Sequence, residues 1–129
     1  MRESIRVRYY ECDMQRVVHN AVYLAWCDEV ADRYFRLAGM GGGDSHVGDW
    51  DVMVKTAALT WTTSATVGDV VDVEPSVSRW GNTSFDVTFD GTRDGAPVFT
   101  ATVTYVGVET GTTRTVRVPD EFRAAVAEV

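Results

Sequence analysis

Cysteine is scarce in this sequence, and long apolar runs are missing. The 129 residues include only Cys12 and Cys27, too few for a disulfide framework, so we expect two free thiols in a reducing cytoplasm. Residues 1–6 lack the apolar core of a secretory signal. The longest unbroken apolar run, residues 21–27, has seven members, far below the roughly 20 that a membrane-spanning helix needs. The sequence therefore predicts a cytoplasmic protein that does not cross a membrane.

Positive charge is also in short supply. Nineteen acidic residues stand against twelve basic ones, which gives a formal net charge of −7. The basic residues are scattered along the chain, whereas a nucleic-acid-binding protein needs a basic stripe that replaces the counterions of phosphate. No polybasic segment of the kind that binds anionic lipids is present either. We therefore expect neither nucleic acid nor a membrane as a partner.

Leucine and isoleucine are rare, with three and one residues, whereas valine and threonine number 22 and 15. β-branched side chains lose rotamer freedom in helices and pack well on pleated sheets, so the composition predicts a mostly β protein. Of these 37 valines and threonines, 29 lie between residues 52 and 118, which locates the sheet. A chain of this length fits one domain, and we expect residues 1–129 to form it.

A helical period begins at Asn20. Apolar residues recur from there at three- and four-residue steps, on the stripe Tyr23, Trp26, Cys27, Val30, Tyr34 and Leu37. Asn20 is a candidate N-cap, and Gly39 follows the last periodic residue, where a C′ glycine is expected. Two acid-to-base pairs at i,i+4 support the opposite side, Glu29 with Arg33 and Asp32 with Arg36. The pattern predicts one helix of about five turns over residues 20–38.

Period-two alternation, typical of strands, brackets this helix. A first strand is predicted at residues 5–9, and a loop at 11–19 joins it to the helix. A flexible glycine-rich connector follows at residues 39–45. Further strand patterns lie at 52–66, 71–74, 85–89, 99–105 and 113–118, with turns at Gly68-Asp69 and Asp94-Gly95. Asp120 is a candidate cap of a short C-terminal helix.

The order of these elements predicts the architecture. A strand and a long helix are followed by about five antiparallel strands. One helix with a broad apolar stripe needs a sheet to cover it, and a single antiparallel sheet curled around one central helix does so most economically. The predicted fold class is therefore α+β rather than α/β.

Motifs for metal, phosphate and serine chemistry are absent. The sequence contains no HExxH, no CxxC pair, no GxxxxGK[ST] and no GxSxG. Only an unusual fold could gather the residue types that bind zinc, which here are His19, His46, Cys12 and Cys27. We therefore expect neither a metal ion nor another cofactor.

Residues 7–24 carry the most chemical information. They place the Asp13 carboxylate in a loop flanked by apolar residues, just before the long helix. A helix N-terminus presents unpaired backbone N–H groups and about half a positive charge. An acyl oxygen bound there would find oxyanion donors beside a carboxylate. The simpler interpretation is that Asp13 caps the helix or contacts its dipole, and the residues alone favour that interpretation.

This segment resembles the signature of the hotdog-fold thioesterases, in particular the 4-hydroxybenzoyl-CoA thioesterase-like branch. The family signature runs from a strand through (D/E)-x-D-x-x-G-x-V to a helix with an early tyrosine and an acid five residues later. The matching residues here are Glu11, Asp13, Val18, Tyr23 and Asp28. The likeness covers most of the chain, because Gly68-Asp69, residues 80–85 and Pro119 also fit. It implies a hotdog fold, in which an antiparallel sheet wraps around one long central helix.

The resemblance also implies roles for individual residues. Asp13 would act as nucleophile or general base on a thioester carbonyl, and the backbone N–H near Asn20 would hold the oxyanion. The sequence does not separate the two roles of Asp13. Glu11 is expected to be structural. The substrate-binding residues implied in this way are His19, Tyr23, Asp28 and Arg79, with packing the simpler role for His19 and a solvent-facing carboxylate an equal alternative for Asp28.

Two positions depart from the family pattern. Arg16 replaces the glycine of the loop, which argues against a positive-φ turn there. Residues 81–83 read Gly-Asn-Thr, in place of the basic residues that often follow the tryptophan. Only Arg79 therefore remains nearby to meet the phosphates of CoA.

Three functions are compatible with these observations. The first is hydrolysis of an acyl-CoA or acyl-carrier-protein thioester to free acid and thiol. The alternative is a non-catalytic acyl-thioester-binding or scaffold protein on the same fold, which Arg16 and the missing basic cluster favour. A hydratase or dehydratase is the weakest, because its histidine and acid stand at spacings that this sequence does not match. Since hotdog proteins bury a sheet edge or face against another copy, a homodimer or homotetramer is expected.

Overall fold

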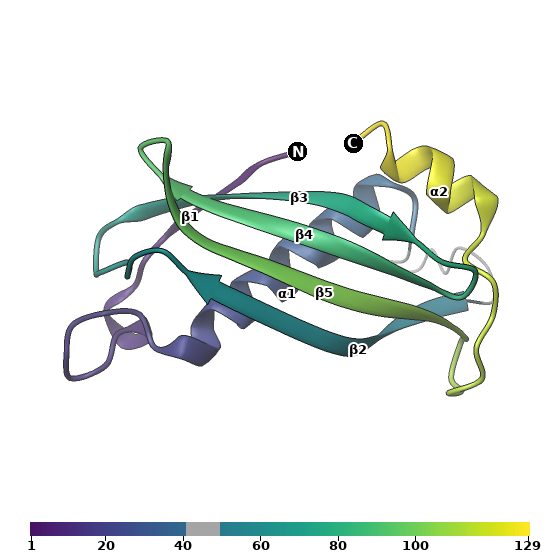
Figure 1. Cartoon of the computed structure of the whole chain (residues 1–129), viewed down its shortest axis with the longest axis horizontal. Helices are drawn as coiled ribbons and strands as arrows, with labels where there is room; N and C mark the ends of the chain where they lie inside the picture. Colours follow the sequence, from purple (N-terminus) through teal and green to yellow (C-terminus); the bar gives the residue numbers. More distant parts are fainter. Residues whose placement is uncertain (41–49) are drawn as a thin grey trace.

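The computed structural model describes residues 1–40 and 50–129 (Figure 1). Most of the connector predicted at residues 39–45, and His46, lie outside the described residues. In chain order the elements are β1 (Glu3–Arg6), the 3₁₀ helix η1 (Tyr9–Glu11), α1 (Asn20–Leu37), β2 (Trp50–Trp61), β3 (Val70–Trp80), β4 (Ser84–Arg93), β5 (Ala96–Glu109) and α2 (Asp120–Val126).

The strands form one antiparallel sheet in the order β1-β3-β4-β5-β2. The sheet curls along α1, which runs behind the strands in Figure 1, with α2 at one end of the sheet. Alternate side chains of β3, β4 and β5 point toward the helix and are buried. The predicted arrangement, one antiparallel sheet around one long helix, is confirmed.

The long helix begins at Asn20 as predicted and ends at Leu37, with Gly39 at φ 89° just beyond it. Two details of the prediction are wrong. The N-cap is His19, because its ring accepts a hydrogen bond from the Ala21 N–H. Leu37 is 55% exposed, because the inward positions of the last turns are taken by larger aromatic side chains.

Of the two predicted ion pairs along the helix, one is present. Arg36 donates to Asp32 at 2.8 Å. Arg33 instead approaches Glu3 on β1 at 3.3 Å, so it ties the helix to the edge of the sheet. This preference leaves Glu29 facing the groove between β1 and α1.

The first and last predicted strands differ from the structure. β1 ends at Arg6, and Tyr9 already belongs to the 3₁₀ turn. Residues 113–118 do not form a strand: they make a single bridge, Val108 with Thr115. Residues 114–116 bond to the end of β5, where the Val116 N–H donates to the Gly107 carbonyl, and the chain then leaves β5, so that the Val118 N–H donates to the Asn82 carbonyl. At the C-terminal helix, Pro119 rather than Asp120 is the N-cap.

The turn between β4 and β5 has the conformation that its sequence predicts. Asp94 and Gly95 both have positive φ, 52° and 80°, as the two central residues of a type I′ hairpin require. The register places Gly91 opposite Phe99, and a Cβ on Gly91 would overlap the Phe99 ring. The glycine therefore makes room for an aromatic ring that packs against Tyr23 at 5.2 Å between centroids.

Both cysteines are free thiols, Cys12 partly and Cys27 fully buried. Burial raises the pKa of Cys27 to about 12, so this thiol stays protonated near neutral pH. Within the described residues, no helix has the length and hydropathy needed to cross a membrane.

Candidate functional site

Residues 12–18 form a small hairpin rather than a structureless loop. Cys12 bridges Val18, the Asp13 N–H donates to the Val17 carbonyl at 2.9 Å, and the Arg16 N–H donates to the Asp13 carbonyl at 2.9 Å. Arg16 adopts φ 66°, as the last residue of this kind of three-residue hairpin loop does. The expectation that arginine would exclude a positive-φ turn is therefore wrong.

The hairpin is attached to the segment that follows β2. The Thr66 hydroxyl donates to the Arg16 carbonyl at 2.6 Å, and Val17 forms a bridge with Thr66. The Val18 N–H donates to the Ala65 carbonyl at 2.9 Å. These bonds hold the left-handed residue in place and fix the hairpin against the body of the fold.

The Asp13 carboxylate organises the tip of this hairpin. Its Oδ1 accepts the Gln15 N–H at 2.8 Å, which makes an Asx turn, and the side chain is exposed. Asp13 therefore does not cap α1, which was one of the two roles in the simpler interpretation of the sequence; the N-cap is His19. Its Oδ2 has no hydrogen-bond partner in the part of the chain that the structure describes, so one oxygen is free for chemistry.

The start of α1 presents an unpaired donor. The Ala21 N–H donates to His19 Nδ1 at 3.2 Å, and the Val22 N–H donates to the His19 carbonyl at 2.9 Å. The Asn20 N–H has no partner among the residues described. Because Nδ1 of His19 is an acceptor, a neutral ring carries its proton on Nε2, which lies outside this cap. The first turn thus offers a free N–H where the helix dipole is positive.

Tyr23, one of the predicted substrate-binding residues, is buried. It is 1% exposed, and its hydroxyl accepts the Ala65 N–H at 3.1 Å. Its ring packs edge-on against Trp61 at 5.9 Å between centroids, and burial raises the pKa of its hydroxyl. The hydroxyl is thus hydrogen-bonded within the protein, and the ring belongs to the buried core.

Asp28 lies on the flank of α1 that faces β5. Partial burial raises the pKa of the Asp28 carboxyl. Burial, followed by the negative charge of Asp28, raises the pKa of Tyr105 on β5. Tyr105 is 4% exposed, and its hydroxyl has no hydrogen-bond partner within the described chain. Asp28 on α1 and Tyr105 on β5 thus influence each other electrostatically.

The inner face of β2 is apolar and only partly covered by α1. Val54 is paired with Tyr105 and Trp61 with Phe99, and directly paired residues share one face of a sheet. Val54 is nevertheless 53% exposed and Trp61 43% exposed. Sequence reasoning did not single out this surface. The sequence pattern that could have identified it is the alternation of apolar and other residues along β2, interrupted by a bulge. The apolar positions are Trp50, Val52, Val54, Ala57, Leu59 and Trp61.

Arg79 is not brought together with Asp13 within one chain. It lies at the end of β3, where Trp80 packs near Phe122 of α2, whereas the hairpin lies at the opposite end of the molecule (Figure 1). Its guanidinium makes two bonds to Asp86, at 2.8 and 3.2 Å. The hydrogen bond to Asp86 raises the pKa of Arg79 further. This cation is already neutralised.

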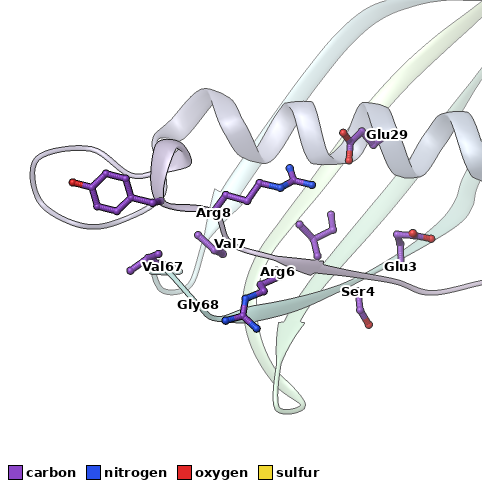
Figure 2. Close-up of a pocket in the computed structure, with 10 residues that line it drawn as sticks. Glu3, Ser4, Arg6, Val7, Arg8, Glu29, Val67 and Gly68 are labelled. Atoms are coloured by element: carbon purple, nitrogen blue, oxygen red, sulfur yellow. The ribbon is translucent and has the colours of Figure 1, made fainter.

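A groove of about 430 Å³ lies between β1 and α1. Arg6 and Arg8 line it, but so do the carboxylates of Glu3 and Glu29. Figure 2 shows Arg8 extending along α1 toward Glu29, while Arg6 points away from the helix. The two cations do not converge, so the groove is not an anion site. Among the residues described, no three His, Cys, Asp or Glu side chains are grouped to hold a metal ion.

Comparisons with known proteins agree on the fold. The chain matches the family described as the Thioesterase-like superfamily over residues 7–126. A 1,4-dihydroxy-2-naphthoyl-CoA thioesterase from Synechocystis superposes with a TM-score of 0.85 at 15% identity, covering 99% of this chain and 96% of that one. The hypothetical protein SAV2348 from Staphylococcus aureus, solved in complex with CoA, gives 0.89 at 18% identity, covering 98% and 81%.

The protein PA5185 from Pseudomonas aeruginosa superposes with a TM-score of 0.86 at 22% identity, covering 99% of this chain and 90% of that one. No curated protein matches the chain. TM-scores of 0.85 to 0.89 over almost the whole of this chain show that these proteins share one fold with it.

Proposed function

The chain belongs to the thioesterase-like superfamily, and on that premise we propose that it hydrolyses an acyl-CoA thioester to free acid and CoA. Family membership supports thioester hydrolysis as the class of reaction. The observation that carries the finer proposal is that one segment of the chain holds both a fixed carboxylate and a free N–H at a helix start. The hairpin holds Asp13 with Oδ2 unused, and the same hairpin ends at the helix start, where the Asn20 N–H is unpaired.

Two chemical routes use these groups. In the nucleophilic route, Asp13 attacks the carbonyl carbon and the C–S bond breaks. The departing thiolate takes a proton, and water hydrolyses the mixed anhydride to free acid and carboxylate. In the general-base route, Asp13 takes a proton from water while the water oxygen attacks the carbonyl carbon. The C–S bond then breaks, and Asp13 passes the proton to the departing thiolate. In both, the Asn20 N–H stabilises the oxyanion.

The apolar strip on β2 supports an acyl-binding role. Val54 and Trp61 are large, exposed and on the inner face of the sheet. Asp28 and Tyr105 border this strip from α1 and β5. An acyl chain placed between the helix flank and the strip would bury apolar surface on both sides, and its thioester would extend toward the hairpin.

We propose that two copies of the chain join along β2. This strand of 12 residues lies at one edge of the sheet, and an exposed edge of that length is a template for pairing with another strand. A second copy related by a two-fold axis would cover Val54 and close the acyl site from the open side. A dimer, or a tetramer built from it, follows.

CoA is the thiol carrier that the comparisons favour, since one similar structure contains CoA and another is described as a CoA thioesterase. Arg79 remains a candidate for contacting the phosphates, but in this chain it is held by Asp86. Any contact from Arg79 would have to reach the site of a second copy, because its own hairpin lies at the far end of the molecule.

The test is release of free thiol from a panel of acyl-CoAs by the wild type and by D13N. Asparagine keeps the Oδ1 acceptor for the Gln15 N–H, so the Asx turn survives and only the charge is lost. We expect kcat to fall by about 10²- to 10⁴-fold. D94N is the matched control, because it removes a carboxylate from the tip of the other hairpin, and it should retain the wild-type rate.

A non-catalytic role makes a different prediction. Acyl-CoAs would then raise the melting temperature of the wild type without releasing thiol. Equal turnover by wild type and D13N would instead exclude Asp13 as the catalyst.

A further inference from the structure

We propose that Glu11 is a positioning residue, which aims the unpaired N–H of the first turn of α1. The proposal rests on the proposed function, since it concerns the donor that would hold the oxyanion. Glu11 lies in η1, two residues before Asp13, and touches α1 at two separate points. One contact is made by its side chain and the other by its main chain.

The side chain of Glu11 is buried inside the fold. Glu11 is 6% exposed, the only buried charged residue in the described part of the chain. Its Oε2 accepts the indole N–H of Trp26 at 2.8 Å, and its Oε1 accepts the Arg8 N–H at 2.8 Å. A buried carboxylate is tolerated only when its oxygens are hydrogen-bonded. Each oxygen here has a donor, so the carboxylate is held in one orientation.

The main chain of Glu11 holds the cap of the helix. Its carbonyl accepts the His19 N–H at 2.9 Å, and His19 in turn accepts the Ala21 N–H through Nδ1 at 3.2 Å. Asn20 lies between His19 and Ala21, and its N–H has no partner among the residues described. The direction of this free N–H is thus set by two neighbours, both of which depend on where the Glu11 carbonyl lies.

The two contacts act together as a clamp. Trp26 belongs to the body of α1, and its ring is packed against Tyr23 at 5.1 Å between centroids. The hydrogen bond to Trp26 therefore fixes Glu11 relative to the body of the helix. The Glu11 main-chain carbonyl in turn fixes the cap residue His19 through the His19 N–H. An oxyanion donor stabilises charge only when it is fixed in advance toward the developing charge. Glu11 supplies that fixation without touching the substrate.

Arg8 completes the environment of this carboxylate. Its guanidinium lies 3.9 Å from Oε2, too far for a direct hydrogen bond, and its side chain runs along α1 toward Glu29 (Figure 2). The charge of Glu11 is therefore stabilised by two N–H donors at short range and one cation at longer range. The carboxylate is buried away from solvent and both of its oxygens are hydrogen-bonded within the fold, so a catalytic role is not implied.

The experiment compares E11A, E11Q and W26F with the wild type. For E11A we expect kcat on the best acyl-CoA of the panel to fall about 10- to 100-fold, because the donor is misdirected rather than removed, with KM changed less than about twofold. E11Q keeps one acceptor and should lie between E11A and the wild type. W26F removes the indole donor, and its effect should not add to that of E11A, since both disrupt one network.

A structural role alone is separated by a matched control. V87A removes buried methyl groups from β4, far along the chain from the helix cap, and should lower the melting temperature as E11A should. Assayed well below both melting temperatures, V87A should keep the wild-type kcat. The shape of the pH–rate profile should be the same in E11A and the wild type, because Glu11 transfers no proton.

Amide hydrogen exchange gives a readout that needs no substrate. In E11A the His19 and Ala21 amides should exchange at least about tenfold faster relative to amides in the middle of α1. Wild-type exchange at both amides, or a wild-type kcat in E11A, would overturn the proposal. If the wild type releases no thiol, the proposed function fails, and the exchange result alone decides the positioning role.

Discussion

The Arg93 guanidinium on β4 donates to Oδ2 of Asp69 at 2.6 Å, and the same oxygen accepts the Thr66 N–H at 2.9 Å. Thr66 also holds the hairpin of residues 12–18 through the Arg16 carbonyl. The Asp69 carboxylate thus connects the end of β4 to the hairpin that carries Asp13. Both hydrogen bonds favour the charged form of Asp69.

The first prediction concerns acid stability. The Thr66 N–H, followed by Arg93, holds the pKa of Asp69 below its ordinary value of 3.8. Because the folded pKa is the lower one, the stabilisation is present above about pH 4 and is lost as pH falls through the folded pKa. We expect D69N to lose about 1–2 kcal/mol at neutral pH and to show a shallower acid dependence in guanidinium chloride titrations.

The partner variant identifies which contact matters. R93A should also lose stability, and the loss in R93A/D69N should be smaller than the sum of the two single losses, because the residues share one interaction. Additive losses would mean that Asp69 acts through Thr66 alone.

A second prediction contrasts two buried tyrosines. The Tyr105 hydroxyl is without a partner in the described chain, whereas the Tyr23 hydroxyl accepts the Ala65 N–H. Removing an unsatisfied buried hydroxyl is favourable, and removing a bonded one leaves a donor orphaned. We therefore expect Y105F to raise the free energy of unfolding by about 1 kcal/mol and Y23F to lower it by about 1–2 kcal/mol. Urea unfolding of both proteins at one protein concentration provides the measurement.

The opposite sign for Y105F would show that its hydroxyl has a partner in the assembled protein. Asp28 is then the group to replace next, because its charge already acts on Tyr105. A stability loss in D28N that vanishes in the Y105F background would identify Asp28 as that partner.

Local patterns in the sequence were sufficient to predict much of the fold. The helix from Asn20 and the turn at Asp94-Gly95 follow from period and from the φ that each residue tolerates. What failed depended on distant partners. Residues 113–118 alternate like a strand, yet their hydrogen bonds go one by one to β5 and to Asn82. No local pattern specifies such a crossing.

In the candidate site, too, local features were predicted from the sequence and contacts between distant residues were not. The loop before the helix, with Asp13 as its acid, was visible in the sequence. The clamp formed by Glu11, Trp26 and His19 was not, because it joins an acid to an indole 15 residues away. The neutralisation of Arg79 by Asp86 was equally hidden, since the two lie on neighbouring strands and become close only through the register of β3 and β4.

A third prediction tests the proposed interface. Val54 and Met53 are neighbours on β2 and similarly exposed, at 53% and 47%, but they lie on opposite faces of the sheet. V54D places a charge on the inner face, where the second copy would cover it, and should raise the dimer dissociation constant at least about 100-fold, which corresponds to roughly 3 kcal/mol. M53D should leave it nearly unchanged. Analytical ultracentrifugation over a concentration series measures both.

If M53D dissociates the dimer and V54D does not, the chains meet across the outer face of the sheet rather than along the β2 edge. If neither does, another surface holds the copies together. In the proposed arrangement, V54D should also lose thioesterase activity in proportion to its monomer fraction, because the acyl site of each chain is closed by the other.

The last prediction concerns the strained residue in the hairpin. Arg16 has φ 66°, a conformation that costs a non-glycine residue about 1–2 kcal/mol, partly offset in R16G by the greater freedom of glycine in the unfolded chain. R16G should therefore raise the free energy of unfolding by about 0.5–1 kcal/mol. D94G should gain less, because aspartate tolerates a positive φ better than arginine does. R16V should lose stability, since a β-branched residue fits this region of φ poorly.

All three variants should retain kcat if the backbone hydrogen bonds of Asp13 and Arg16, rather than the arginine side chain, set the geometry of the site. A large fall in kcat in both R16G and R16V, with D94G unchanged, would instead give the guanidinium a part in the reaction.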